Sequence, residues 1–284
     1  MNSPLAQKHQ PILQTHNLGK AVSTPAGELT LLQDINFSVQ AGDSVAIVGT
    51  SGSGKSTLLG LLAGLDLPSS GDIVLDGLSF AALDEEQKAA LRARKVGFVF
   101  QNFQLLPSLT ALENVMLPLE LRRVDTHTQC EQRARDFLGR VGLAERLDHY
   151  PRTLSGGEQQ RVAIARAFAG LPAILFADEP TGNLDRKTAS HIADLLFALN
   201  RDTGTTLILV THDEQLATRC ARRLRMEEGQ LTETTAEGFN LAARAAAEWT
   251  LNALTAEHRD WLINLPQGEQ RLLQQRGIGR QLVR

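Results

Sequence analysis

A glycine-rich segment, residues 49–57, constrains the fold of this chain more than any other feature. It fits the pattern G-x-x-x-x-G-K-[ST] and reads Gly49, Thr50, Ser51, Gly52, Ser53, Gly54, Lys55, Ser56, Thr57. The run before it, 43–48, is short, apolar and β-branched, as in a buried strand, and residues 57–64 have the composition of a helix. The pattern predicts a strand, a phosphate-binding loop and a helix in direct succession.

The residue types in this loop suit the phosphates of a nucleotide. Its glycines permit backbone conformations in which consecutive N–H groups converge on phosphate oxygens. The helix N-terminus adds unpaired donors and partial positive charge. We expect Lys55 to reach the β- and γ-phosphates and the Ser56 hydroxyl to bind Mg²⁺. The alternative, a glycine-rich turn with a solvated lysine, is disfavoured by the flanking strand and helix.

A second apolar run, 172–177, ends in two adjacent carboxylates, Asp178 and Glu179. Neighbouring side chains of a strand point to opposite faces. The chain turns at Pro180, however, so both acids can approach one site. We expect Asp178 to contact Mg²⁺ through water and Glu179 to polarise the attacking water. Without the glycine-rich loop, a surface acid pair at a strand end would be the simpler interpretation.

Further motifs follow in a fixed order, and together with the loop they resemble the ABC-type ATPases. Gln101 resembles the glutamine of the Q-loop, residues 154–159 the signature, and residues 183–185 the D-loop. Asp178 and Glu179 resemble the Walker B acid and the catalytic acid. His212 resembles the switch histidine and follows the apolar run 206–210, at the strand end that faces ligands in this kind of sheet. Chance does not give this whole series in order.

The resemblance implies the bound groups and the residues that hold them. ATP and Mg²⁺ are the implied ligands, with metal contacts from Ser56, Gln101 and Asp178. The implied catalytic residues are Glu179, His212, Gln101 and Lys55. The implied contacts of ATP are Gly49, Ser51, Gly52, Ser53, Gly54, Lys55, Ser56, Thr57, Gln101, Ser155, Gly156, Gly157, Glu158, Asp185 and His212.

The signature also indicates that two copies of the chain act together. Residues 155–157 at the start of a helix would present a hydroxyl, closely approaching backbone and a positive helix end to an anion. The chain's own γ-phosphate is expected in its own glycine-rich loop, so the signature would bind ATP held by a second copy. We expect two chains to enclose two ATP molecules around a two-fold axis.

Within the family, the segments 65–71, 101–115 and 176–186 resemble the branch of lipoprotein-release and MacB-type efflux ATPases. That resemblance implies a permease with few membrane spans and a large periplasmic region. One departure concerns the base of the nucleotide. The family stacks adenine on an early aromatic residue, and none occurs near Val22. Because stacking contributes roughly 1–3 kcal/mol in nucleic-acid sites, we expect weaker nucleotide affinity or purine selectivity.

Composition limits the remaining classes of function. The chain has 284 residues, 42% hydrophobic and 21% charged, enough for one large α/β core and an addition. A net charge of −3 argues against nucleic-acid binding, which needs a basic face. The two cysteines, Cys130 and Cys220, lack metal-ligand spacing and fit a reducing cytosol. Residues 1–10 lack the apolar core of a signal peptide, and 58–65 is too short to span a membrane.

The order of the motifs predicts the architecture. We expect an α/β fold with a RecA-like core, an antiparallel β arm from 12–15, 35–39 and 71–77, a helix over 84–95, and a helical subdomain over about 102–165. Residues 1–231 form the ATP-binding domain, and 232–284 are a linker and a helical tail of unassigned role. A groove for a permease helix is expected at Phe103, Leu105, Leu106, Leu109 and Leu112; the alternative is that these side chains are core.

The sequence thus favours an ATP-hydrolysing subunit of a bacterial inner-membrane transporter, held at the cytoplasmic face by a separate permease and acting on lipophilic or lipoprotein-like cargo. The alternative is mechanotransmission, in which the same motor regulates a periplasmic process without moving a substrate. A soluble translation or DNA-repair ATPase fits poorly. The chain has a single cassette, and the stretch between Lys55 and Asp178 is too short for a long coiled coil.

Overall fold

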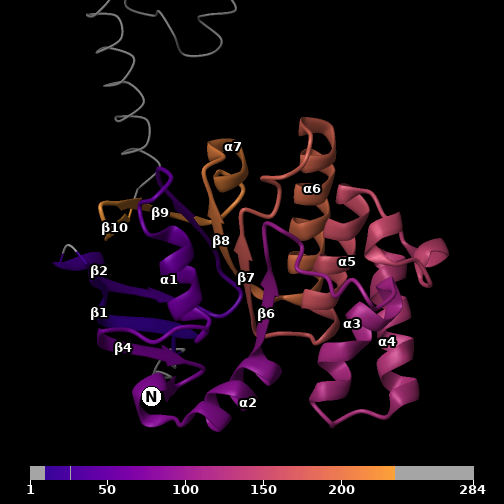
Figure 1. The fold of residues 1–284 in the computed structure, drawn as a ribbon, viewed down its shortest axis with the longest axis horizontal. Coiled ribbons are helices and arrows are strands. Elements are labelled where there is room, and N and C mark those ends of the chain that lie inside the picture. Colours follow the sequence, from indigo (N-terminus) through magenta and orange to yellow (C-terminus); the bar gives the residue numbers. More distant parts are fainter. Residues whose placement is uncertain (1–9, 26, 234–284) are drawn as a thin grey trace, which may run out of the picture. The chain divides into compact units, whose positions relative to one another are not determined.

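A computed structural model describes residues 10–25 and 27–233, which belong to one compact unit ending at Glu233 (Figure 1). A sheet of six strands forms its centre, in the order β10-β9-β3-β8-β7-β6. The strands are β3 (Ser44–Val48), β6 (Val96–Val99), β7 (Ile174–Asp178), β8 (Thr206–Thr211), β9 (Arg222–Glu227) and β10 (Gln230–Glu233). All pair in parallel except β10, which runs antiparallel to β9. This is the parallel core that the sequence predicts.

Both faces of the central sheet are buried, and alternate residues of each strand face different cores. Val45 and Ile47 of β3 belong to one hydrophobic cluster, and Ala46 and Val48 belong to the other. The same alternation holds along β7 and β8. Side chains of successive strand residues point to opposite faces, so these fully apolar runs require cover on both sides. The sheet is therefore the middle layer of the fold.

Seven helices cover the sheet within the described residues. They are α1 (Lys55–Leu62), α2 (Glu85–Lys95), α3 (Ala111–Leu121), α4 (His127–Arg140), α5 (Gly156–Ala169), α6 (Arg186–Thr203) and α7 (Glu214–Ala217). Short 3₁₀ turns lie at Phe80–Ala82, Ala144–Arg146 and Pro151–Thr153. The N-termini of α2 to α5 carry capping boxes, in which a Ser, Thr or Asp is followed three residues later by Gln or Glu. None of these helices is long and apolar enough to cross a membrane.

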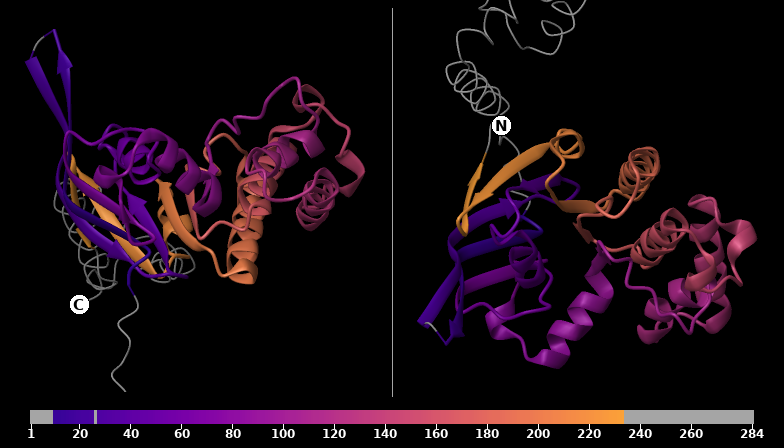
Figure 2. Two further views of the ribbon diagram at one scale, coloured as in Figure 1. Left: turned by 90° about the horizontal axis from the view of Figure 1, so that it is seen from below. Right: turned by 45° about the horizontal axis from the view of Figure 1, so that its top comes forward.

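A second sheet, antiparallel, has the order β2-β1-β4-β5. Its strands are β1 (Leu13–Thr24), β2 (Gly27–Val39), β4 (Ser70–Leu75) and β5 (Leu78–Ser79). The expected β arm is confirmed, although the first two strands are much longer than the runs 12–15 and 35–39. In Figures 1 and 2 this sheet and helices α3 to α5 lie on opposite sides of the central strands, and α1 packs between the two sheets.

The structure decides one open alternative and corrects one expectation. Leu112 is core and does not line a groove, since it is 8% exposed and belongs to the hydrophobic cluster under α3. The linker was expected to begin at Thr232, but Thr232 and Glu233 pair with Arg225 and Leu224 in the ladder of β10 and β9. The predicted helices of the tail lie outside the described residues, which end at Glu233.

Candidate nucleotide-binding site

The predicted motifs converge on one edge of the central sheet. The glycine-rich loop follows β3, Gln101 follows β6, Asp178 and Glu179 end β7, and His212 follows β8. These four strands are parallel, so their C-terminal ends meet at the same edge. Ligands of open α/β sheets bind in the crevice outside these ends. Topology alone thus gathers residues that are far apart in the sequence.

The glycine-rich loop wraps around the ammonium group of Lys55. Lys55 Nζ donates hydrogen bonds of 2.8 Å to the carbonyls of Gly49 and Thr50, and the residue is 8% exposed. Gly54, the N-cap of α1, has a φ of 102°, which a side chain would strain. A Cβ on Gly49 would collide with the carbonyl of Met226. The loop therefore needs glycine at these positions to close over the lysine.

A buried hydroxyl in the same loop has no partner in the described part of the chain. Ser53 Oγ is buried and makes no hydrogen bond. Leaving such a group unpaired costs about 1–3 kcal/mol, so an unpaired hydroxyl beside converging amides is suited to an incoming acceptor. The loop fits a phosphate group by this criterion as well as by its pattern.

Two hard oxygen groups meet next to the loop. Ser56, at the start of α1, donates from Oγ to Asp178 Oδ1 over 3.3 Å. Burial raises the pKa of Asp178, and the nearby charge of Glu179 raises it further, against the opposing effects of Ser56 and Lys55. A hydroxyl and a desolvated carboxylate fit the oxygen ligands that Mg²⁺ prefers. A cation here would also offset the repulsion between the two acids.

Glu179 points away from this pair because its backbone is left-handed, with a φ of 44°. Its Oε1 lies 2.9 Å from His212 Nδ1, and its Oε2 accepts from the hydroxyl of Thr211 over 3.3 Å. The Glu179 side chain is 13% exposed and that of His212 is 70% exposed. The two neighbouring carboxylates thus have separate partners at one sheet edge, as expected from the turn at Pro180. The imidazole remains open to solvent.

Gln101 joins the end of β6 to the D-loop. Its Nε2 lies 3.4 Å from Asn183 Oδ1, and Asn183 Nδ2 donates to the carbonyl of Gln101 at 3.1 Å and to Asn102 Oδ1 at 2.8 Å. The structure therefore places the Gln101 side chain against residue 183. Its expected contact with a metal remains a prediction.

The signature motif begins α5, on the other face of the sheet from α1. Apolar residues of α1 belong to the cluster with the antiparallel sheet, and those of α5 belong to the opposite cluster. Ser155 caps α5, and Glu158 Oε2 accepts from the Ser155 amide and hydroxyl at 2.8 Å each. These bonds lower the pKa of Glu158. Its carboxylate therefore serves the cap, while Ser155 and Gly156 stay exposed.

Asp185 also serves as a cap. Its Oδ1 accepts from the amides of Lys187 and Thr188 at the start of α6, each over 3.1 Å. Its expected contact with ATP remains a prediction.

The effect of the missing aromatic residue near Val22 also remains a prediction. Val22 lies half-buried on β1 opposite Leu29, which is 52% exposed.

Sequence reasoning missed residues that hold the motifs together. Thr211 binds Glu179, and its position directly before His212 was the available signal. Gln160 donates from Nε2 to the carbonyl of Pro180 at 2.6 Å, which ties α5 to the turn after Glu179. Arg166 donates to the carbonyls of Phe103 and Gln104. Neither Gln160 nor Arg166 could be assigned from its pattern, because each lies on a long helix among many polar residues.

A parallel sheet with these motifs at its strand ends, an antiparallel arm and a helical region carrying the signature define an ATP-binding cassette. Residues 32–182 match the family model described as ABC transporter, and the chain belongs to this family. The chain is an ABC-type ATPase, the ATP-binding subunit of a transporter, as its fold and relatives indicate together.

Known relatives cover most of the chain. It is 57% identical over 222 residues to the ABC transporter ATP-binding protein YbbA of Escherichia coli K12, covering 78% of this chain and 97% of YbbA. It is 51% identical over 221 residues to the lipoprotein-releasing system ATP-binding protein LolD of Bordetella pertussis, covering 78% and 95%. The cassette MJ0796, solved as a dimer in a post-hydrolysis state with ADP and Pi, is 38% identical with a TM-score of 0.73, covering 79% and 99%.

Proposed function

We propose that this chain hydrolyses ATP in pairs at the cytoplasmic face of a bacterial inner membrane and thereby drives a separate permease. The convergence of the Ser56–Asp178 and Glu179–His212 pairs at one sheet edge, next to the glycine-rich loop, is the observation that carries the proposal. Lipophilic or lipoprotein-like molecules are the proposed cargo, by analogy with the lipoprotein-releasing relative LolD.

In this proposal the loop amides, Lys55 and the buried hydroxyl of Ser53 bind the phosphates of ATP. Ser56 and Asp178 hold Mg²⁺, with Asp178 acting through water, and Gln101 joins them once its bond to Asn183 is released. When bound, the metal neutralises phosphate charge. The ammonium of Lys55 would exchange its bonds to loop carbonyls for bonds to phosphate oxygens, which are stronger because both partners are charged.

Glu179 is the proposed base, and His212 and Thr211 are its positioning partners. Two contacts hold the carboxylate, so it can accept a proton from a water molecule without first paying to become ordered. His212 is exposed at the sheet edge and can turn its ring toward a phosphate while Nδ1 stays on Glu179.

Two copies are proposed because the glycine-rich loop and the signature begin helices on opposite faces of the central sheet. This packing of α1 and α5 supports a site completed by the signature of a second chain. The cassette MJ0796 was solved as a dimer, which also supports this arrangement. In the proposed homodimer, Ser155, Gly156 and Gly157 of each chain would bind the ATP of the other.

A groove beside α3 is the proposed docking site of the permease. Its volume is about 400 Å³, and its walls include Phe98, Phe100, Leu106, Leu117 and Leu121. Of the five residues expected to line such a groove, only Leu106 does so. An apolar groove between helices fits an amphipathic helix of a partner. The proposed partner is a permease with a large periplasmic region.

The first test is the substitution Glu179→Gln. The amide keeps the shape of the side chain but is a poor base, so ATP should bind while turnover falls by about a hundredfold or more. The variant should accumulate as an ATP-dependent dimer in size-exclusion chromatography. Turnover close to that of the unmodified chain would remove Glu179 from its proposed role.

The second test concerns the membrane partner and the cargo. The tagged Glu179→Gln chain, with ATP, would be used to recover the permease from native membranes. Lipid or lipoprotein carried with the complex would support transport. A permease that stimulates ATP hydrolysis without carried substrate would instead favour mechanotransmission.

A further inference from the structure

The proposed docking groove is positively charged as well as apolar. Its lining includes the guanidinium groups of Arg122 and Arg166, and no aspartate or glutamate lies among the lining residues. Apolar side chains at its rim are open to solvent, with Leu106 44% and Leu121 70% exposed. A groove that is apolar and cationic, with no anion of its own, selects among apolar helices by charge.

Arg166 contributes a cation without an acidic partner in the described residues. It projects from α5 and donates to two carbonyls, Gln104 at 2.6 Å and Phe103 at 2.9 Å. Burial lowers the pKa of Arg166, with no offsetting contribution from a carboxylate. Carbonyl groups leave the charge itself uncompensated, and three of its five N–H donors remain available. Arg166 is half-buried, and charges removed from water are usually paired in proteins.

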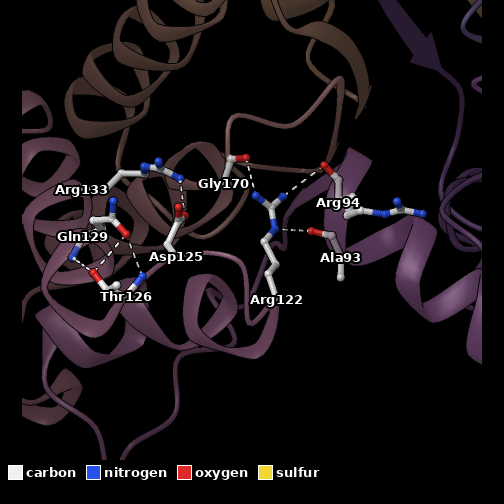
Figure 3. A network of polar contacts seen from close by, with 8 residues as sticks. All are labelled: Ala93, Arg94, Arg122, Asp125, Thr126, Gln129, Arg133 and Gly170. Atoms are coloured by element: carbon white, nitrogen blue, oxygen red, sulfur yellow. Dashed lines mark hydrogen bonds and ion pairs between the residues drawn. The ribbon is translucent and has the colours of Figure 1, made fainter.

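Arg122 contributes the second cation, and Figure 3 shows how it is held. Its guanidinium donates to the carbonyls of Ala93, Arg94 and Gly170, with 2.6 Å to Gly170, so it joins the end of α3 to the ends of α2 and α5. Asp125 is nearby but is turned to Arg133 at 3.0 Å. Burial lowers the pKa of Arg122, and the charge of Arg133 lowers it more than Asp125 raises it.

We infer that the groove takes an amphipathic helix of the membrane partner that carries an acidic side chain within its apolar face, and that Arg166 and Arg122 bind this carboxylate. The inference rests on the proposed function, because it assumes that the groove is the permease site. A carboxylate forms paired, charge-assisted hydrogen bonds with guanidinium groups. A glutamine in its place would leave the charges uncompensated, and a lysine would be repelled.

Binding of this carboxylate has a path to the nucleotide site. Phe103 and Gln104, whose carbonyls Arg166 holds, have φ values of 57° and 47°, both left-handed. Such conformations cost energy for residues other than glycine and persist only when other contacts enforce them. A carboxylate that draws Arg166 away releases the turn that begins two residues after Gln101. Through this turn, the inferred carboxylate would act on Gln101 and its contact with Asn183.

The test uses three synthetic helical peptides of about 18 residues, long enough to form a helix when isolated. They share a leucine and alanine face and carry glutamate, glutamine or lysine at its centre. Binding to the full chain is measured by fluorescence anisotropy at low and high salt. We expect the glutamate peptide to bind about tenfold tighter than the glutamine peptide. Salt should reduce the difference.

Substitutions in the chain test whether Arg166 and Arg122 cause the preference for the glutamate peptide. Arg166→Met and Arg122→Met should each remove most of the preference for glutamate, while Arg135→Met, an exposed arginine of α4 paired with Glu131, should keep it. If a methionine variant fails to fold, Arg166→Lys and Arg122→Lys keep the charge but lose the paired geometry, and should reduce the preference. Equal binding of the glutamate and glutamine peptides, or an unchanged preference in the folded groove variants, overturns the inference.

The assay needs no nucleotide. Failure of the peptides therefore leaves the ATPase proposal standing, and normal turnover in Glu179→Gln would leave the peptide result standing.

Discussion

Adjacent acids at the end of β7 contact different partners, and the backbone angle of Glu179 accounts for the difference. Asp178 ends the strand toward Ser56, and the left-handed conformation of Glu179 turns the next carboxylate toward His212. Strand geometry by itself would send the second side chain to the opposite face. The sequence predicted that both acids serve one site, since Pro180 follows. It could not predict the contact with Thr211, which depends on the register of β7 and β8.

Asp178→Asn should make the fold more stable while it lowers ATP turnover. Burial and the charge of Glu179 raise the pKa of Asp178, so ionising this carboxyl costs more in the folded chain than in the unfolded one. At neutral pH the amide should raise the melting temperature, because it removes the cost of ionising a partly buried carboxyl, a cost that solvent screening keeps small. Magnesium-dependent turnover should fall by about a hundredfold or more.

The pH dependence of the stability gained in Asp178→Asn follows from the raised pKa of Asp178. A carboxyl whose pKa is raised on folding destabilises the native state above that pKa. As pH falls the native carboxyl takes up its proton first, so the gain from asparagine should shrink toward pH 4. Thermal melts at several pH values in a magnesium-free buffer would measure it. A lower melting temperature at neutral pH would contradict the unfavourable burial of Asp178.

At the scale of elements, the sequence predicted which segments are helices and strands better than it predicted how long they are. Apolar runs, caps and the strand–loop–helix pattern indicated the parallel sheet and the helix 84–95, which the structure has as α2 from Glu85 to Lys95. The first two strands of the antiparallel sheet continue far beyond the apolar runs that predicted them. Their outer halves are held by pairing between β1 and β2, which local periodicity does not report.

The two glycines that begin α5 have different neighbours. A Cβ on Gly157 would lie 2.6 Å from Thr188 Cγ2 of α6, whereas one on Gly156 would be in ordinary contact, 3.5 Å from Leu184 Cδ2. Gly157→Ala should therefore separate α5 from α6 and destabilise the fold by about 1–3 kcal/mol, the cost of overpacking. Gly156→Ala is the matched control and should leave the melting temperature nearly unchanged. A melting temperature of Gly157→Ala as high as that of Gly156→Ala would mean that the close contact with Thr188 relaxes freely.

At the scale of the whole molecule, the division of the cores by the central sheet supports the proposal that two chains form each site. The loop around Lys55 belongs with α1 on one face, and the signature begins α5 on the other. From the chemistry of the signature, the sequence predicted that a second chain completes the site, but it could not show which face of the sheet each helix covers. Strand order and side-chain alternation supply that information.

Two substitutions of Ser155 test the paired arrangement. Ser155→Arg should lower turnover by about a hundredfold, the scale of losing a preorganised donor to an anion, while the monomer still binds ATP through its own loop. The arginine also removes the cap of α5, worth about 1 kcal/mol. Ser155→Ala is the control for that loss, since alanine also removes the cap but places no bulky cation in the pocket. It should show a similar fall in melting temperature and keep more turnover than Ser155→Arg.

Mixing variants decides whether the signature acts on its own chain or on its neighbour. Ser155→Arg keeps an intact loop at Lys55, and Lys55→Ala keeps an intact signature, so each alone should be inactive. In a mixed dimer, the loop of the first variant faces the signature of the second, and one complete site forms. Activity should then appear on mixing and increase with the amount of the inactive partner. A mixture as inactive as its components would place both halves of the site in one chain and exclude the paired arrangement.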